Sequence, residues 1–110
     1  MKEVKRPWGD FKQFVLNKKC TVKILTIKPR QKLSLQYHFK REESWYFLTS
    51  GKIQIGGKIK KIKKGELVNI PKKKPHRIIS GHKEVKVLEI SYGTFSEKDE
   101  IRLEDKYGRK

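Results

Sequence analysis

The sequence predicts an all-β fold of one domain, a sandwich or a barrel. Three observations support this. The 110 residues fit one compact domain, β-branched and aromatic residues gather in short runs, and turn residues separate these runs about every eight to twelve positions. No segment carries an apolar face of helical period long enough for a helix bundle.

The predicted elements follow in chain order. The first strand, 20–29, is rich in β-branched residues and stops at Pro29. Residues 33–40 alternate strictly between apolar and polar, and 44–51 form an apolar run that ends at Ser50-Gly51. Residues 52–62 predict a hairpin around Gly56-Gly57. Further strands are expected at 66–71, 76–80 and 84–93, followed by a short helical turn near 96–100.

The net charge of +17 comes from 29 Lys and Arg against 12 Asp and Glu. Only six of the basic residues are Arg, the residue that base and phosphate recognition favours. Because the lysines are spread along the chain, the pattern favours a solvated surface over a nucleic-acid interface. Such a field still attracts small anions such as sugar phosphates.

Composition also limits the compartment and the partners. No apolar run approaches the roughly 18 residues of a membrane helix, and the first residues lack a secretory core. The lone cysteine, Cys20, excludes a disulfide framework. We therefore expect a cytoplasmic protein without a membrane partner. The apolar first segment, Pro7-Trp8 and 11–16, together with unprotected edge strands predicts a homodimer.

The strand at 33–40 carries a polar row of Ser34, Gln36, His38 and Lys40 on one face. That row either faces solvent or lines a cavity inside the barrel. Glu43 follows a charged turn, and His76 begins another strand after a Pro-rich turn. Two histidines and a carboxylate on neighbouring strands suit a divalent metal with open positions, which favours the cavity.

These residues resemble the two cupin motifs. His38, Glu43 and Gly51 occupy their places in the first motif, and Gly65, Pro71 and His76 occupy theirs in the second. The chain departs from the motifs at four places. The motifs have Gly where this chain has Arg30 or Gln31 and Lys73. They have His at the position of Lys40 and Asn at the position of Ser80. The resemblance implies a cupin-type jelly-roll β-barrel, the double-stranded β-helix, as a single domain over 1–110.

A narrower resemblance is carried by RPWG, LSLQYH, NIP, PHR and EDKYGR, at 6–9, 33–38, 69–71, 75–77 and 104–109. In this order they resemble the cupin domain of type II mannose-6-phosphate isomerases. That domain usually ends a bifunctional chain with mannose-1-phosphate guanylyltransferase. The nucleotidyltransferase half has no counterpart here, so that activity is not expected.

The family resemblance implies that a metal is surrounded by Gln36, His38, Glu43 and His76. Zinc is the first expectation, with manganese or iron as alternatives. The family commonly has His where Lys40 and Ser44 stand. A protonated Lys40 cannot ligate, so we expect weaker metal binding. Its ammonium either binds substrate oxygens or phosphate, or fills the metal position itself.

The implied reaction interconverts mannose 6-phosphate and fructose 6-phosphate. It needs an electrophile at the carbonyl, a general base and cations for the phosphate. Glu89 is the candidate base if its side chain points into the barrel, although alternation alone equally allows it to face solvent. The candidate cations are Lys40 and Arg41 for substrate binding, and Arg77 and Arg109 for catalysis.

Three functions stay open at this point. The first is this metal-dependent isomerase, and the second is a non-catalytic cupin that binds a sugar or a small anion. Lys40 and Ser44 favour the second. The third is a basic nucleic-acid-binding β-barrel, which the spread of the lysines disfavours.

Overall fold

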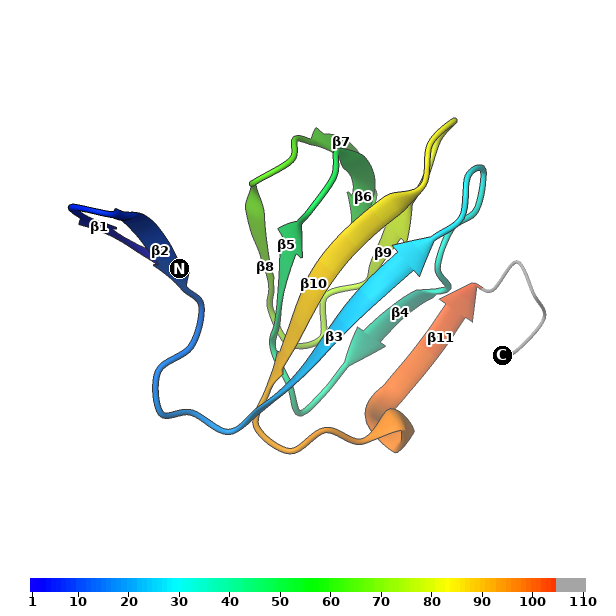
Figure 1. Ribbon diagram of the computed structural model, residues 1–110. Helices are drawn as coiled ribbons and strands as arrows, with labels where there is room; N and C mark the ends of the chain where they lie inside the picture. Colours follow the sequence, from blue (N-terminus) through cyan, green and yellow to red (C-terminus); the bar gives the residue numbers. More distant parts are fainter. Residues whose placement is uncertain (105–110) are drawn as a thin grey trace.

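The computed structural model describes residues 1–104 and shows two β-sheets that face each other (Figure 1). Its strands are β1 (Lys2–Arg6), β2 (Gly9–Gln13), β3 (Cys20–Ile27), β4 (Leu35–His38), β5 (Glu43–Phe47), β6 (Gly51–Ile55), β7 (Lys58–Ile62), β8 (Leu67–Ile70), β9 (His76–Ile79), β10 (Val85–Tyr92) and β11 (Glu100–Glu104). A short 3-10 helix covers Glu97–Asp99. None of the described helices is long and apolar enough to cross a membrane.

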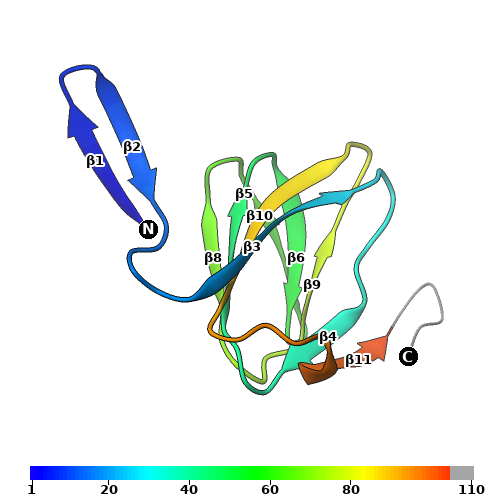
Figure 2. The same cartoon turned by 60° about the horizontal axis from the view of Figure 1, so that its bottom comes forward.

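The two sheets have the order β3-β10-β5-β8 and β11-β4-β9-β6-β7, and the paired strands are antiparallel. Neighbouring strands in each sheet are mostly distant in sequence, as expected of a jelly roll. Figure 2 shows the sheets facing each other. The all-β prediction is therefore confirmed, and the fold is a jelly roll of two sheets that do not close fully.

The apolar core fills one end of the space between the sheets. Trp45, Phe47, Ile78 and Val87 have no exposed surface, and Ile53 is 1% exposed. These side chains come from β5, β6, β9 and β10, so the core joins both sheets. Along the same strands the inward positions turn polar toward the opposite end, where the candidate site lies.

The predicted strands from 20 to 93 are all present; most are shorter than expected, and β5 and β6 each begin one residue earlier. The strand expected over 33–40 keeps only Leu35–His38, because Phe39 and Lys40 turn away and donate their backbone N–H groups to the Asp99 carboxylate, at 3.1 and 3.0 Å. The helical turn expected near 96–100 is the 3-10 helix. Strands β1, β2 and β11 were not predicted from the sequence.

Strands β1 and β2 form a hairpin that pairs with no other strand within residues 1–104. Figures 1 and 2 show it standing apart from the two sheets. Its turn at Pro7-Trp8 leaves Trp8 72% exposed. An isolated two-stranded hairpin is only marginally stable in water, which makes this segment a candidate for contacts with another chain.

Candidate metal centre

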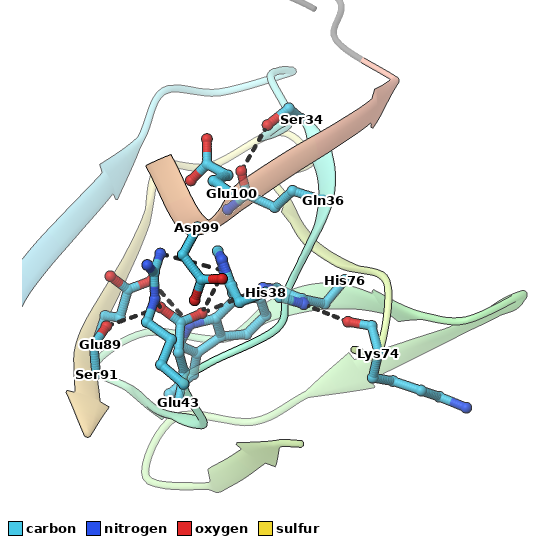
Figure 3. Close-up of polar contacts among 12 residues, drawn as sticks. Ser34, Gln36, His38, Glu43, Lys74, His76, Glu89, Ser91, Asp99 and Glu100 are labelled. Carbon is cyan, nitrogen blue, oxygen red and sulfur yellow. Dashed lines mark hydrogen bonds and ion pairs between the residues drawn. The ribbon is translucent and has the colours of Figure 1, made fainter. Parts of the chain in front are cut away.

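Three side chains from three strands meet at the polar end of the barrel. His38 ends β4, Glu43 begins β5 and His76 begins β9. One ligand atom from each lies within 4.8 Å of the other two, and all three residues are buried. Figure 3 shows the three side chains converging. These three residues were predicted from the sequence as metal ligands, and the structure brings them together.

Glu43 lies at the centre of the cluster. Its Oε1 is 3.3 Å from Nε2 of His38 and 3.3 Å from Nε2 of His76. Its Oε2 accepts hydrogen bonds from Oγ of Ser91 at 2.9 Å and from Nε of Arg41 at 3.4 Å. One carboxylate oxygen is thus fixed by the protein, and the other faces the two imidazoles.

The charge on Glu43 is stabilised despite its burial. Burial raises the pKa of this carboxyl, but hydrogen bonding and positive charge from His38 and His76 lower it by more. The net result is a pKa well below the usual range for glutamate. The carboxylate is therefore available as a ligand throughout the neutral pH range.

His76 directs Nε2 toward Glu43. Its Nδ1 lies 2.7 Å from the carbonyl oxygen of Lys74 and donates to it, so Nε2 carries a proton toward Glu43 in the charged ring and a lone pair for a metal in the neutral ring. The buried atoms Nε2 of His76, Oε1 of Glu43 and Nδ1 of His38 have no hydrogen-bond partner within the described residues. Two of these atoms, Nε2 of His76 and Oε1 of Glu43, face each other at 3.3 Å, and a proton or a metal cation between them would satisfy both.

This ligand set fits a divalent metal. Two imidazoles and one carboxylate with open positions are typical of catalytic zinc and of non-haem iron sites. The backbone carbonyl that holds His76 is the kind of partner that orients metal-binding histidines. The described residues thus contain a possible His/Glu metal site, and zinc, manganese and iron all accept this set.

Gln36, the predicted fourth ligand, lies beside this cluster but is held elsewhere. Its amide lies beside Ser34 and Glu100 (Figure 3). With the amide nitrogen turned toward the carboxylate of Glu100, Nε2 is 3.0 Å from Oε1, 3.1 Å from Oε2 and 3.0 Å from Oγ of Ser34. In this arrangement the amide supports Glu100. Gln36 as a metal ligand therefore stays a prediction.

A cavity of about 170 Å³ opens next to the metal cluster. Glu89 lines it together with Glu43, so the inward of the two orientations considered for Glu89 is the one found. Its carboxylate accepts a hydrogen bond from Nε1 of Trp45 at 3.2 Å. Burial, and then the negative charge of Glu43, raise the pKa of Glu89. This carboxyl therefore favours its protonated form more than an exposed glutamate does.

Arg41 also lines the cavity, as expected of a substrate-binding candidate. It is 3% exposed, and it donates to Glu43 and to the carbonyl oxygen of Ser96, at 2.8 Å. Its guanidinium lies 4.5 Å from the ring centre of Phe95. These contacts fix Arg41 against the metal cluster.

The other predicted cations lie elsewhere. Lys40 is exposed beyond the end of β4. Arg77 is buried, but it donates to Oε1 and to the backbone oxygen of Glu104, each at 3.3 Å. Since adjacent strand residues point to opposite faces, Arg77 faces away from the metal cluster to which His76 belongs. Arg109 lies outside the described residues.

Several cavity residues were not predicted from the sequence. They are Lys23, Phe95, Glu100 and Arg102, which line the cavity, and Ser91, which binds Glu43. Alternation along β3 and β10 carried a usable signal, because Lys23 and Ser91 share a face with core residues. No such signal marked Glu100 and Arg102, since β11 itself was missed.

Comparisons with known proteins agree with this fold. Among solved structures, the capsular polysaccharide assembling protein CapF of Staphylococcus aureus superimposes with a TM-score of 0.70 at 19% identity, over 93% of this chain and 34% of CapF. Oxalate decarboxylase of Bacillus subtilis superimposes with a TM-score of 0.70 at 25% identity, over 78% and 24%. The fold and the buried His/Glu cluster thus define a cupin.

The family model described as "Mannose-6-phosphate isomerase C-terminal" matches residues 1–105. This chain belongs to that family. Mannose-1-phosphate guanylyltransferase ManC of Salmonella typhimurium is 32% identical over 98% of this chain and 23% of ManC. The alginate biosynthesis protein AlgA of Pseudomonas aeruginosa is 35% identical over 97% of this chain and 23% of AlgA. The chain thus spans about a quarter of the length of these relatives.

Proposed function

We propose that this chain is a metal-dependent isomerase that interconverts mannose 6-phosphate and fructose 6-phosphate. The observation that carries the proposal is that Glu89 and Glu43, the central residue of the His38–Glu43–His76 cluster, line the same cavity. The Glu89 carboxyl, whose pKa is raised, can act as the base, and a metal held by the cluster can act as the electrophile on the same small molecule. Family membership supports the substrate class.

The residues act as follows in the proposed mechanism. His38, Glu43 and His76 would hold the metal, which when bound supplies Lewis-acid polarisation of the sugar carbonyl. Glu89 takes the proton from C2 of the aldose, the C–H electron pair forms the C1–C2 double bond, and the carbonyl pair moves to O1. The hydroxyl proton of O2 passes to O1, and Glu89 returns its proton to C1 as the O2 electron pair forms the ketose carbonyl. Trp45 holds the Glu89 carboxylate in place.

A coupled assay for fructose 6-phosphate tests the proposal, with protein loaded in turn with zinc, manganese or iron. Glu89→Gln should lower kcat roughly 100-fold or more and leave metal content unchanged. Glu84→Gln, which removes an exposed carboxylate, is the matched control. An unchanged kcat in Glu89→Gln would remove Glu89 from the mechanism, and a metal-loaded wild type without turnover would reject the isomerase.

Binding without catalysis is the second candidate function, a cupin that holds a sugar or a small anion. Ser44 favours it, because this residue stands where the family commonly has His. Its Oγ lies 2.8 Å from Oδ1 of Asn69 and 2.8 Å from Oη of Tyr92, away from the metal cluster. Calorimetric binding of mannose 6-phosphate by a metal-loaded protein without turnover would establish this function.

We further propose that the chain forms a homodimer through the β1–β2 hairpin. The hairpin exposes Trp8 and Phe11, at 72% and 37%, and the outer face of β3 exposes Val22 and Ile24, at 55% and 61%. One chain thus carries two apolar surfaces, and a two-fold axis can place each hairpin over the β3 face of the other copy.

Light scattering after size exclusion tests the dimer. Wild type should elute with twice the chain mass at micromolar concentration, and Trp8→Asp combined with Ile24→Lys should elute as a folded monomer. Ile59→Lys, which removes an aliphatic residue that is 63% exposed on β7, should leave the dimer intact. A wild-type monomer would contradict the proposal.

A further inference from the structure

Lys23 has an unusual position for a lysine in a β-strand. It lies on β3 between Val22 and Ile24, which are 55% and 61% exposed, whereas Lys23 lines the cavity beside the metal cluster. The strand therefore turns two aliphatic side chains outward and one cation inward. Because an inward cation loses part of its hydration, this arrangement needs an anionic or polar partner in the cavity.

Within residues 1–104, no carboxylate forms an ion pair with Lys23. Glu89 is the cross-strand neighbour of Lys23 in the β3–β10 pairing, which is visible as adjacent strands in Figure 1. Nevertheless, no described carboxylate lies within 4.0 Å of Nζ of Lys23. The ammonium instead lies 4.0 Å from the ring centre of Phe95.

Phe95 connects Lys23 to the metal cluster. The guanidinium of Arg41 lies 4.5 Å from the centre of the same ring, and Arg41 donates to Glu43. An anion held by Lys23 would thus lie within the cavity, separated by the Phe95 ring from Arg41, which contacts Glu43. Glu100 and Arg102 on the opposite wall neutralise each other through a 2.9 Å ion pair. Lys23 is therefore the cavity cation best placed to receive an anion.

We propose that Lys23 binds the phosphate group of the sugar-phosphate substrate and so selects phosphorylated sugars. The inference rests on the proposed function for the substrate class. A lysine ammonium is a compact charge that suits phosphate, and Phe95 holds it toward the cavity. The phosphate then fixes the sugar with its C1–C2 end toward Glu89 and the metal residues.

The test compares mannose 6-phosphate with mannose by calorimetry on the metal-loaded, full-length protein. Wild type should bind mannose 6-phosphate more tightly than mannose. Lys23→Met should weaken binding of mannose 6-phosphate roughly 10- to 100-fold and leave that of mannose unchanged. Lys23→Arg should restore most of the difference. Lys86→Met, which removes an exposed lysine of β10, controls for the change in net charge.

Kinetics separate this role from a counter-ion role toward Glu89. With phosphate binding, Lys23→Met raises KM for mannose 6-phosphate and leaves the pH profile of kcat in place. A shifted pH profile with unchanged KM would overturn the proposal and assign Lys23 to positioning Glu89. Equal binding of the two sugars by wild type would also overturn it. Selective binding without turnover in any variant would support Lys23 and reject only the isomerase.

Discussion

The two ends of the barrel use the same strands for opposite purposes. Across the sheet of β3, β10 and β5, the register aligns Leu25, Val87 and Phe47 in an apolar row at one end. One step along, at the next inward positions, the row is Lys23, Glu89 and Trp45. The next row is Thr21, Ser91 and Glu43. Within four residues of each strand, the inward face thus changes from core to site.

The core end of the barrel stabilises the fold, whereas the site end carries the candidate chemistry. Burial of the apolar rows is the term that drives folding. The buried carboxylates at the other end oppose folding unless a partner compensates them. Changes at the core end should therefore affect unfolding first, and changes at the site end should affect metal binding first.

Phe47→Ala at the core end should have the largest effect. Phe47 has no exposed surface, and its loss leaves a cavity among Val85, Val87 and their neighbours. We expect a loss of about 3–5 kcal/mol in the free energy of unfolding. Urea denaturation measures it, with Phe39→Ala at a 46% exposed position as the control. Equal losses in both variants would contradict the assignment of the core.

Glu43→Gln at the site end should remove most of the bound metal. The amide keeps the shape of the side chain but removes the only carboxylate among the three clustered ligands. Metal affinity should fall by roughly 100-fold or more, since the cation would lose its charged ligand. Elemental analysis after dialysis measures occupancy, with the exposed Glu42→Gln as the control. Full occupancy in Glu43→Gln would place the metal elsewhere.

Gly51→Ala should destabilise the core end by a smaller amount. A Cβ at this position would lie 2.9 Å from Cγ1 of Val85 and 3.1 Å from Cε2 of Phe47. The crowding should cost about 1–3 kcal/mol. Thermal unfolding measures it, and Gly57→Ala, where a Cβ meets nothing within 4 Å, should be close to wild type. Relief by an added Val85→Ala would confirm that the cause is overpacking.

Lys73→Gly should stabilise the loop that holds the site end. Lys73 has a φ of 64° and donates its backbone N–H to the carbonyl oxygen of His38. The cupin motif has Gly here, and Gly adopts this conformation without a steric penalty. We expect a gain of about 0.5–1 kcal/mol by urea denaturation. Lys72→Gly nearby, without positive φ, should be neutral or destabilising.

The sequence predicted the metal cluster because motif spacing fixes which strand ends meet. His38, Glu43 and His76 each lie at the end or start of a strand, and antiparallel pairing brings those ends together. Gly51 and Gly65 also agree with the motif, since one lacks room for a Cβ and the other has a φ of 88°. Motif spacing was thus sufficient wherever the backbone path decides the position.

Motif spacing was insufficient where the direction of a side chain decides whether the residue reaches the site. Arg77 follows inward His76 and must point the other way, so its prediction as a catalytic residue ignored alternation. Lys40 would share the face of His38 only if the strand continued, and it ends at His38. The β1–β2 hairpin was missed because its strands lack an apolar alternation, and β11 was missed because its sequence is mostly charged.

Glu89→Gln should have the smallest effect on the free energy of unfolding. This substitution at the site end should stabilise the fold, whereas Phe47→Ala and Gly51→Ala at the core end destabilise it. The folded state raises the pKa of Glu89 above the ordinary value of 4.5, through burial and the charge of Glu43, although Lys23 and Arg41 partly oppose this. The folded chain thus holds this proton more tightly than the unfolded chain, and ionisation destabilises it as the pH rises from about 4.5. Glutamine avoids that cost and still accepts the hydrogen bond from Trp45.

The stability of Glu89→Gln relative to wild type should therefore increase between pH 4 and pH 7. Urea denaturation in chelator at several pH values measures this difference, because metal binding would mask it. Glu84→Gln, at an exposed position, should show a flat difference over the same range. A decrease with pH would mean that the folded state stabilises the Glu89 carboxylate. Glu89 would then lose the raised pKa that suits it to proton transfer, and the site end would hold two stabilised carboxylates instead of one ligand and one base.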